Sequence, residues 1–352
     1  MKKYYPQIIR FKNQTEYASF LKKNEVIVIE LFDTLAGELF ISTHPKIYFS
    51  GKDVQKKATD AYLFSLHNNN FYSLGSWVYH PWNKTLLHLI PQLDYLNLRT
   101  IRHKYLLSET DQKSLYNKKI AIAGLSVGSN ILLSLIRHGI GRQYKIADMD
   151  KVNLSNINRT VYSLHDIGLY KTEVMLQMIN GIDPFIKVET YQEGLNSSSL
   201  LSFIDKTDLI IDAFDQFDLK INLRKLAKKK KIPIISGFDI EKGILLIVER
   251  YDIESAIKSN IFINETGKKL LRNDLTINEK TKLFIDIIGK KHHSRIMLKS
   301  VREVGKTLTG YPQLIIATLL AASAFTLASE KVLLNKSITS YRKFISLDQL
   351  VQ

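Results

Sequence analysis

Hydrophobic positions in the middle of the chain alternate between a strand period and a helix period. Short apolar runs predict strands over 119–124, 144–148, 185–191, 208–214 and 232–237. Amphipathic segments between them predict helices over 130–139, 169–180, 198–205 and 217–231. This alternation predicts an α/β fold with a Rossmann-like, doubly wound parallel sheet, whose ligand binds at the carboxyl ends of the strands.

The first hundred residues follow a different pattern, in which short helical and strand-like segments mix. A helix is predicted over 15–23 and a strand over 26–32, and residues 75–91 alternate well enough for an edge strand. Trp77 and Trp82 in that segment could form a ligand-stacking platform, but aromatic residues in such strands are more often core. We therefore interpret both as core residues.

A polar joint over 107–118 separates these patterns. With 352 residues, of which 45% are hydrophobic, the chain is long enough for two domains. We predict a small α+β N-terminal domain over 1–100, as a candidate peptide-docking module, and an ATP-binding domain over 101–352. None of the residues in the first domain identifies its ligand.

The stretch "IAIAGLSVGSNI" over 120–131 has the strand, turn and helix order of a phosphate-binding loop. Its glycines do not match the dinucleotide pattern G-x-G-x-x-G, because Ser126 and Ser129 stand where the second and third glycines are expected. Gly124, Ser126 and Gly128 remain candidates for contacts to a nucleotide.

Polar residues that suit phosphate chemistry follow the second predicted strand. Asp148 lies 20 residues after Gly128, where a Rossmann domain places the acid that binds ribose, and alone it would favour NAD. A dehydrogenase needs no further cluster there, whereas Arg and Lys with an orienting Asn neutralise charge on a phosphoryl group. The cluster comprises Asp148, Asp150, Asn156, Asn158, Arg159 and Lys171.

Four segments resemble the adenylation domain of the ThiF/MoeB family, which is related to the ubiquitin-activating enzymes. They are "GLSVGS", "DMDKVNLSNINR", "GLYKTE" and "DAFDQFDLK", and the resemblance covers residues 95–250. The spelling "GLSVGS", with "WVYHPW" and "GYPQLIIATLLAASA", is similar to a bacterial branch that carries an additional N-terminal domain.

The resemblance implies ATP and Mg²⁺ as ligands. Asp148 would hold the ribose, Asn156, Arg159 and Lys171 would contact the phosphates, and Asp215 would be the metal ligand. The implied nucleotide-binding residues are Gly124, Ser126, Gly128, Asp148, Asp150 and Asn156. The implied catalytic residues are Arg159, Lys171, Asp215 and Arg102.

The segment "LNLRTIRHKY" resembles the part of the family that lends an arginine to the other subunit. We assign that role to Arg102, with Arg99 as its structural neighbour. An arginine supplied in trans implies a homodimer.

The chain contains no cysteine, which excludes disulfides, thiolate zinc sites and thioesters on this chain. It therefore lacks the zinc site and the catalytic cysteine of some relatives, and no zinc is expected. Adenylation remains: a carboxylate of a peptide or small protein is activated as an acyl-adenylate and pyrophosphate is released. The alternatives are a tRNA-modifying dehydratase of the same fold and a non-catalytic nucleotide-binding scaffold, with an NAD oxidoreductase as a distant fourth.

A net charge of +16 and a basic stripe at Arg295, Lys299, Arg302 and Lys306 bear on the RNA alternative. Their spacing predicts one amphipathic helix over 294–308 with the four cations on one face. The simpler interpretation, which we prefer, is a solvated helix in a lysine-rich chain. The N-terminus lacks the apolar core of a signal peptide and the apolar run 314–329 is too short to span a bilayer, so we expect a cytoplasmic protein with no membrane partner.

Overall fold

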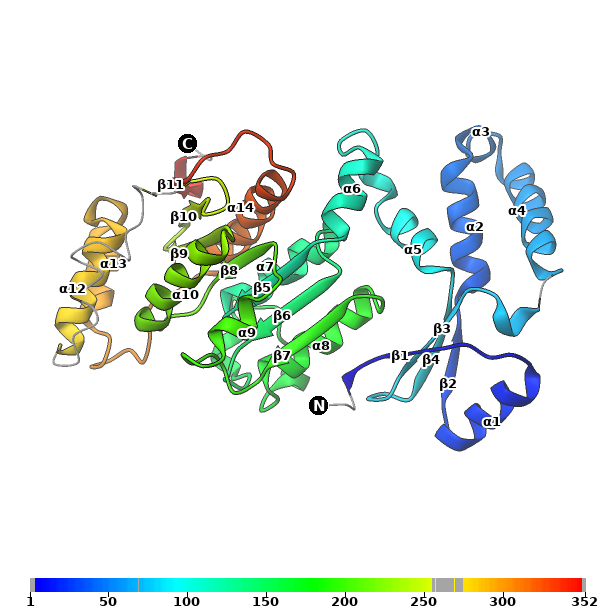
Figure 1. Cartoon of the computed structure of the whole chain (residues 1–352), viewed down its shortest axis with the longest axis horizontal. Helices are drawn as coiled ribbons and strands as arrows, with labels where there is room; N and C mark the ends of the chain where they lie inside the picture. The colour runs from blue at the N-terminus through cyan, green and yellow to red at the C-terminus, as the bar shows by residue number, and fades with distance from the viewer. Residues whose placement is uncertain (1–3, 69, 255–256, 258–268, 270–274, 350–352) are drawn as a thin grey trace. The chain divides into compact units, whose positions relative to one another are not determined.

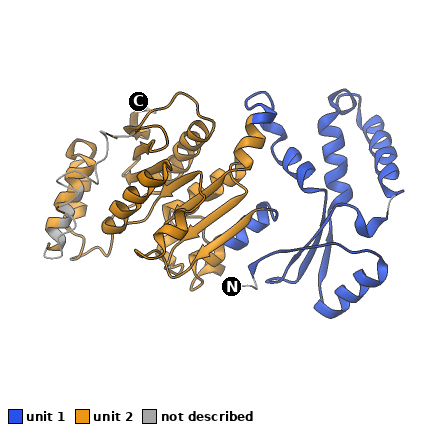
Figure 2. Cartoon of the chain, in the orientation of Figure 1, with its two compact units in different colours: residues 1–110, 176–185 blue, residues 111–175, 186–352 orange. Residues whose placement is uncertain are grey.

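The computed structural model describes residues 4–68, 70–254, 257, 269 and 275–349. The chain divides into two compact units (Figures 1 and 2). The first unit comprises residues 1–110 and 176–185, and the second comprises 111–175 and 186–352. The first unit runs to residue 110 and also includes residues 176–185, so it does not coincide with the predicted domain over 1–100. The predicted boundary at residue 100 stays a prediction.

The first unit is built on a four-stranded sheet in the order β1-β3-β4-β2. Its strands are β1 (Gln7–Ile9), β2 (Ile27–Glu30), β3 (Ser76–His80) and β4 (Thr85–Leu89). Its helices are α1 (Gln14–Asn24), α2 (Phe32–Thr43), α3 (Pro45–Tyr48), α4 (Lys52–His67) and α5 (Gln92–Arg99), with short 3₁₀ turns η2 (Phe71–Ser73) and η3 (Ile101–His103). The predicted edge strand is wrong, because β3 pairs with β1 on one side and β4 on the other.

An aromatic cluster forms the core of the first unit around Trp77, which is 1% exposed. The indole stacks on the imidazole of His88, with ring centroids 3.9 Å apart. His88 in turn lies 2.8 Å from a carboxylate oxygen of Glu30. The core interpretation of Trp77 is confirmed, whereas Trp82 lies beyond the strand, half-buried, and stacks on His80.

The second unit contains a seven-stranded sheet in the order β11-β10-β9-β8-β5-β6-β7. Its strands are β5 (Lys119–Ala123), β6 (Gln143–Ala147), β7 (Lys187–Tyr191), β8 (Leu209–Asp212), β9 (Ile234–Ile240), β10 (Gly243–Glu249) and β11 (Tyr341–Ser346). The five strands predicted from the apolar runs are parallel, which confirms the Rossmann-like fold class. The sheet is not wholly parallel as expected, since β10 and β11 add antiparallel strands at one edge.

Helices connect these strands and continue beyond them. They are α6 (Glu109–Tyr116), α7 (Val127–Arg137), α8 (Lys171–Ile182), α9 (Leu200–Ile204), α10 (Phe217–Lys230), α12 (Ile277–Ile288), α13 (Arg295–Arg302) and α14 (Ile315–Leu333). The 3₁₀ turns are η4 (Leu154–Asn156), η5 (Leu164–Asp166), η6 (Lys290–His292) and η7 (Leu347–Gln349). The predicted polar joint is largely the helix α6, whose buried side includes Leu115 and Tyr116.

Two sequence expectations about the C-terminal helices need correction. The amphipathic helix expected over 294–308 ends at Arg302, so Lys306 is exposed beyond α13 rather than on its face. The apolar run expected to be too short for a bilayer extends into α14, which is long and apolar enough by length and composition. Half of that apolar window is buried, and α14 packs on α7, β9 and β10, so it is a core helix.

A buried ion-pair network fixes the end of β8. Asp212 accepts hydrogen bonds from Lys220 Nζ at 2.6 Å and Arg224 Nη1 at 2.7 Å. The other guanidinium nitrogen, Nη2, lies 2.8 Å from Glu249 in β10 and donates to Ser236 in β9 at 3.0 Å. Asp212 and Arg224 therefore tie α10 to three strands of the sheet.

Candidate active site

Two adjoining cavities lie at the carboxyl ends of the parallel strands in the second unit. The larger has a volume of about 420 Å³ and the smaller about 230 Å³. Their walls share Ser126, Asp150, Lys171, Ala213, Phe214 and Asp215. A doubly wound sheet binds its ligand in a cleft at this edge.

The turn after β5 requires glycine at its first position. Gly124 has φ +88°, and a Cβ there would lie 2.3 Å from the carbonyl oxygen of Ala213. Ser126 precedes α7 and makes no side-chain capping bond, so its hydroxyl is available on the wall of both cavities. Gly128 lies buried within α7, outside the described walls of both cavities. The N-terminal N–H groups of a helix favour an anion near this turn.

Asp148 holds the turn in place from the end of β6. Its Oδ2 accepts the backbone N–H of Leu125 at 2.6 Å, and its Oδ1 accepts that of Asp150 at 2.8 Å. Burial raises the pKa of Asp148, while the Lys171 ammonium 3.7 Å away and these backbone N–H groups oppose the rise. Asp148 thus lines the smaller cavity with both oxygens already engaged.

Lys171 stands at the junction of the two cavities. It begins α8, its side chain is only 4% exposed, and its Nζ lies 2.7 Å from Asp150 Oδ2. The Lys171 backbone N–H also donates to the Asp150 carbonyl, which fixes the helix start against that loop. Lys171 thus places a buried ammonium, paired with two carboxylates, where the two cavities meet.

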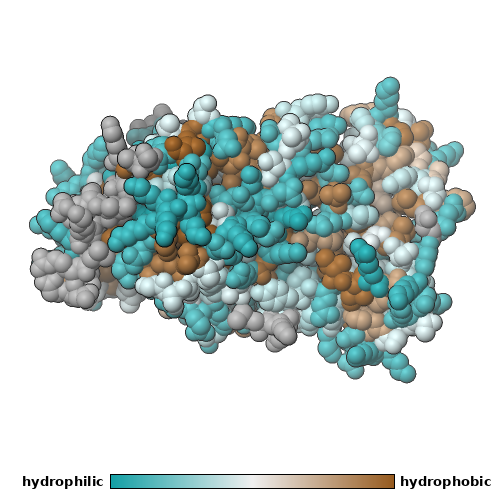
Figure 3. All heavy atoms as spheres, viewed as in Figure 1, coloured by the Kyte–Doolittle hydropathy of each residue, from teal (hydrophilic) through white to brown (hydrophobic). Residues whose placement is uncertain are grey.

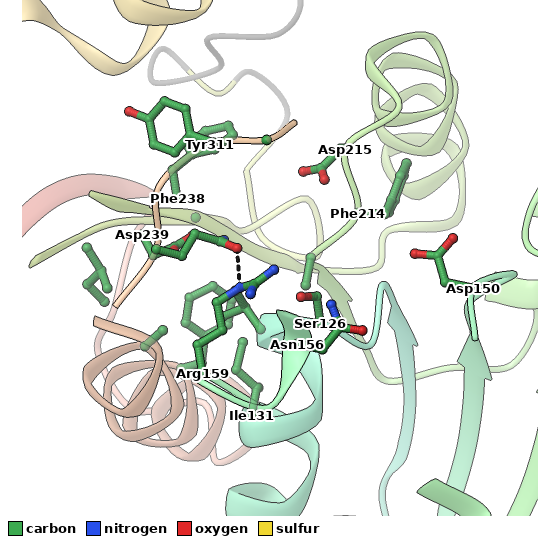
Figure 4. A pocket seen from close by; sticks show the side chains of 18 of the residues that line it. Ser126, Ile131, Asp150, Asn156, Arg159, Phe214, Asp215, Phe238, Asp239 and Tyr311 are labelled. Carbon is green, nitrogen blue, oxygen red and sulfur yellow. Dashed lines mark hydrogen bonds between the residues drawn. The ribbon is translucent and has the colours of Figure 1, made fainter. Parts of the chain in front are cut away.

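Arg159 and Asn156 line only the larger cavity. The Asn156 side-chain oxygen accepts the Asn153 backbone N–H at 3.0 Å in a capping box. The Arg159 Nη1 donates to the Ser155 carbonyl at 2.6 Å and to Asn158 Oδ1 at 2.9 Å. Figure 4 shows the guanidinium of Arg159 pointing toward the strand that carries Asp239.

Asp215 lies exposed in the loop after β8 and lines both cavities. Among the residues that the structure describes, no group of three side chains could hold a metal ion by itself. Mg²⁺ suits this donor set, since the ion often takes one or two carboxylates and completes its shell with phosphate oxygens and water. The site therefore fits a magnesium ion that arrives with a nucleotide.

Arg102 is not among the described residues that line either cavity. Arg102 is exposed on η3 in the first unit, whereas the described walls of both cavities come from the second unit. Its neighbour Arg99 pairs with the buried Asp183 at 3.1 Å. Arg99 therefore forms an ion pair with a buried carboxylate of its own unit.

Several residues of the larger cavity were not identified from the sequence. They are Lys220, Phe238, Asp239, Tyr311 and Gln313. Asp239 could have been noticed as a carboxylate near the carboxyl end of a predicted strand. Gln313 lies in "GYPQ", where nothing in the local pattern assigns a role.

The sequence model of the ThiF family matches residues 99–349, which is most of the chain. The chain belongs to the ThiF family. Members of this family are ATP-dependent adenylyltransferases, which agrees with the phosphate-binding character of the cavities. ATP is therefore the nucleotide of the family fold.

Three relatives illustrate how far the similarity reaches. A Mycobacterium tuberculosis protein described as uncharacterized is 30% identical over 240 residues, covering 68% of this chain and 33% of its own length. The sulfur carrier protein adenylyltransferase of Thermus thermophilus is 29% identical over 128 residues, covering 36% of this chain and 47% of its own. The Escherichia coli tRNA N6-threonylcarbamoyladenosine dehydratase in complex with ATP superposes with a TM-score of 0.50 at 19% identity, covering 68% of this chain and 96% of its own. The chain spans between a third and a half of the curated relatives named here.

Proposed function

We propose that this ThiF family member adenylates a carboxylate of a peptide or small protein, using Mg·ATP and releasing pyrophosphate. The observation that supports it most is the junction of two cavities at Lys171, Asp150 and Asp215. In this proposal the smaller cavity, with Gly124 and Asp148, takes the adenosine. The shared wall and the adjoining part of the larger cavity, with Asn156 and Arg159, take the phosphates and Mg²⁺. The rest of the larger cavity takes the acyl group.

The chemistry follows from that division. An oxygen of the substrate carboxylate attacks the α-phosphorus, the bond to the β-phosphate bridge oxygen breaks, and pyrophosphate leaves with the electron pair. Lys171 and Arg159 would stabilise the charge that builds on the phosphoryl oxygens. Mg²⁺, held by Asp215 and the phosphates, would neutralise the leaving group. Since the chain has no cysteine, the acyl-adenylate passes to an external nucleophile or collapses internally.

Product analysis tests the proposal. Mass spectrometry of material that co-purifies with an Asp215→Asn variant would identify the substrate. With that substrate, the wild type should release AMP and pyrophosphate in equal amounts. Lys171→Ala and Arg159→Ala should each lower the rate by on the order of 100-fold, because each removes a preorganised charge. Stoichiometric ADP release would contradict adenylation.

The proposed assembly is a cytoplasmic homodimer in which Arg102 completes the partner's site. Subunit exchange between inactive Arg102→Ala and inactive Asp215→Ala proteins should then restore part of the activity, because one site in each mixed dimer is intact. No recovery despite demonstrated exchange would place Arg102 outside the partner's chemistry.

A tRNA-modifying dehydratase is the second candidate. Arg295, Lys299 and Arg302 are all exposed on α13, which suits a phosphate backbone. Figure 3 shows hydrophilic residues over α10, whose last turn contains Lys228, Lys229 and Lys230. Basic residues are therefore not confined to α13. If the stripe binds RNA, replacing these residues and Lys306 by Gln should reduce the log-log salt slope for bulk tRNA by roughly three.

We favour the peptide substrate, because the residues before 95 form a substantial additional part that a docking role would explain. Removing residues 1–95 should then abolish reaction with the peptide, while tRNA binding at physiological salt should be weak and independent of the stripe. Tight, stripe-dependent tRNA binding would reverse this ranking. A non-catalytic scaffold is disfavoured because it has no need for Lys171, Arg159 and Asp215 together.

A further inference from the structure

We propose that Asp239 is a positioning residue, which orients Arg159 for the phosphates through the side-chain amide of Gln313. This inference rests on the proposed function, since it takes ATP as the ligand of Arg159. It concerns two residues, Asp239 and Gln313, to which the sequence analysis assigns no role.

The three side chains form a continuous hydrogen-bonded relay along the wall of the larger cavity. Gln313 Nε2 donates to Asp239 Oδ1 at 3.1 Å, and Gln313 Oε1 accepts from Arg159 Nε. Arg159 lies in the loop after β6, Asp239 lies in β9, and Gln313 lies in the segment before α14. All three line the cavity, so the relay exists only when these distant segments have come together.

The direction of the relay follows from the chemistry of the amide. A glutamine amide has one donating end and one accepting end. Because Asp239 can only accept once ionised, it draws the NH₂ end of Gln313 and turns the oxygen toward Arg159. Without an acceptor at position 239 the amide is free to rotate and present a donor to the guanidinium, which has no acceptor of its own.

The other contacts of Arg159 leave one part of the guanidinium for a ligand. Nη1 is held by the Ser155 carbonyl and by Asn158, and Nε is held by Gln313. Nη2 has no hydrogen-bond partner among the residues that the structure describes. The relay therefore holds the Arg159 guanidinium so that its Nη2 N–H groups are the ones available to a ligand in the cavity.

Packing alone does not account for the carboxyl group of Asp239. Its Oδ2 is buried without a hydrogen-bond partner among the described residues. Burial raises the pKa of Asp239, which Gln313 only partly opposes. A buried polar atom left unsatisfied is destabilising, and an apolar side chain would avoid that cost. The carboxyl group of Asp239 is therefore explained by the hydrogen bond that it accepts from Gln313.

Binding of two probes tests the relay without knowledge of the acyl substrate. Calorimetric titration compares Mg·ATP, which needs the phosphate contact, with adenosine, which does not. Arg159→Ala should weaken Mg·ATP by about tenfold, as expected for one charge-assisted contact. Asp239→Leu and Gln313→Leu should each lose at least about threefold for Mg·ATP and leave adenosine unchanged within about twofold.

Two further variants separate an effect that acts through Arg159 from a general effect of the substitution on the fold. Asp239→Asn keeps an acceptor for Gln313, so it should recover most of the affinity that Asp239→Leu loses. Adding Asp239→Leu to Arg159→Ala should cause no additional loss, because the relay acts through Arg159. Gln112→Leu is the matched control, since it removes a buried glutamine of the second unit that bonds to main-chain carbonyls outside the cavities.

Each outcome decides the matter. An additional loss in the double variant, an equal loss of adenosine, or affinities equal to the wild type would overturn the relay while leaving the proposed function standing. The same holds if Arg159→Ala binds Mg·ATP normally, because there would be no phosphate contact to position. A wild type that binds no Mg·ATP would overturn the relay together with the proposed function.

Discussion

Lys171→Met should weaken Mg·ATP binding strongly, because it removes a cation that lies between two carboxylates at the junction of the cavities. Lys171 Nζ lies 2.7 Å from Asp150 and 3.7 Å from Asp148. With the ammonium gone, the local formal charge of these three side chains changes from −1 to −2. A triphosphate would then approach two uncompensated carboxylates.

The magnitude follows from Coulomb's law at short range. One unit charge about 4 Å from a phosphate oxygen is worth about 4 kcal/mol at an effective dielectric constant of about 20. Asp150 is largely exposed, so solvent and Mg²⁺ screen part of this, and about 2 to 3 kcal/mol remains. At about 1.4 kcal/mol per tenfold, the dissociation constant should rise about 30- to 150-fold.

Calorimetric titration with Mg·ATP and with adenosine measures this effect. Adenosine affinity should stay near the wild-type value, and Lys171→Arg should recover part of the ATP affinity. Lys151→Met is the matched control, since Lys151 lies in the loop that precedes α8 and is exposed beside the ring of Tyr170. Less than about threefold weakening of Mg·ATP, or an equal loss of adenosine, would refute the electrostatic argument.

Three further outcomes are expected from the described contacts. Arg224→Met should lower the free energy of unfolding by about 3 to 5 kcal/mol in urea titration, because it takes the ion-pair partner from the buried Glu249, whereas Lys230→Met, in an exposed pair, should cost under about 1 kcal/mol. Burial lowers the pKa of His80 to about 4, so the unfolded chain takes up this proton first as the pH falls from 6.5. Wild type should then lose about 3 kcal/mol more stability than His80→Phe between pH 6.5 and 4, and parallel pH profiles would contradict this. Gly124→Ala should abolish Mg·ATP binding and lower the melting temperature, since its Cβ meets the Ala213 carbonyl; unchanged binding would show that the turn can move.

The sequence predicted the parallel part of the second unit well because each element there has a strong local signal. β5 is an apolar run followed by a glycine, and α7 begins after a three-residue turn with helical periodicity. The same reasoning failed for β3, whose partner β1 lies about seventy residues earlier in the chain. Alternation along a strand reports which face is buried, but not how many neighbours the strand has.

The candidate site shows the same limit. Lys171, Arg159 and Asp215 could be predicted because they lie in motifs that follow strands at the ligand-binding edge. Gln313 could not, because its importance comes from two contacts, to residues 74 and 154 positions away. Lys306 illustrates the opposite error, since its spacing continued the basic stripe after the helix itself had ended.

The wall of the larger cavity has a consequence for the order in which the protein becomes competent during synthesis. Its residues run from Ser126 to Phe325, so the last of them leaves the ribosome about two hundred residues after the first. The wall of the smaller cavity ends at Gln216, so all of its residues are synthesised about a hundred residues before Phe325 completes the wall of the larger cavity. N-terminal parts of a chain generally fold first during synthesis. If the proposed function holds, the part of the site assigned to adenosine is therefore made before the part assigned to the acyl group.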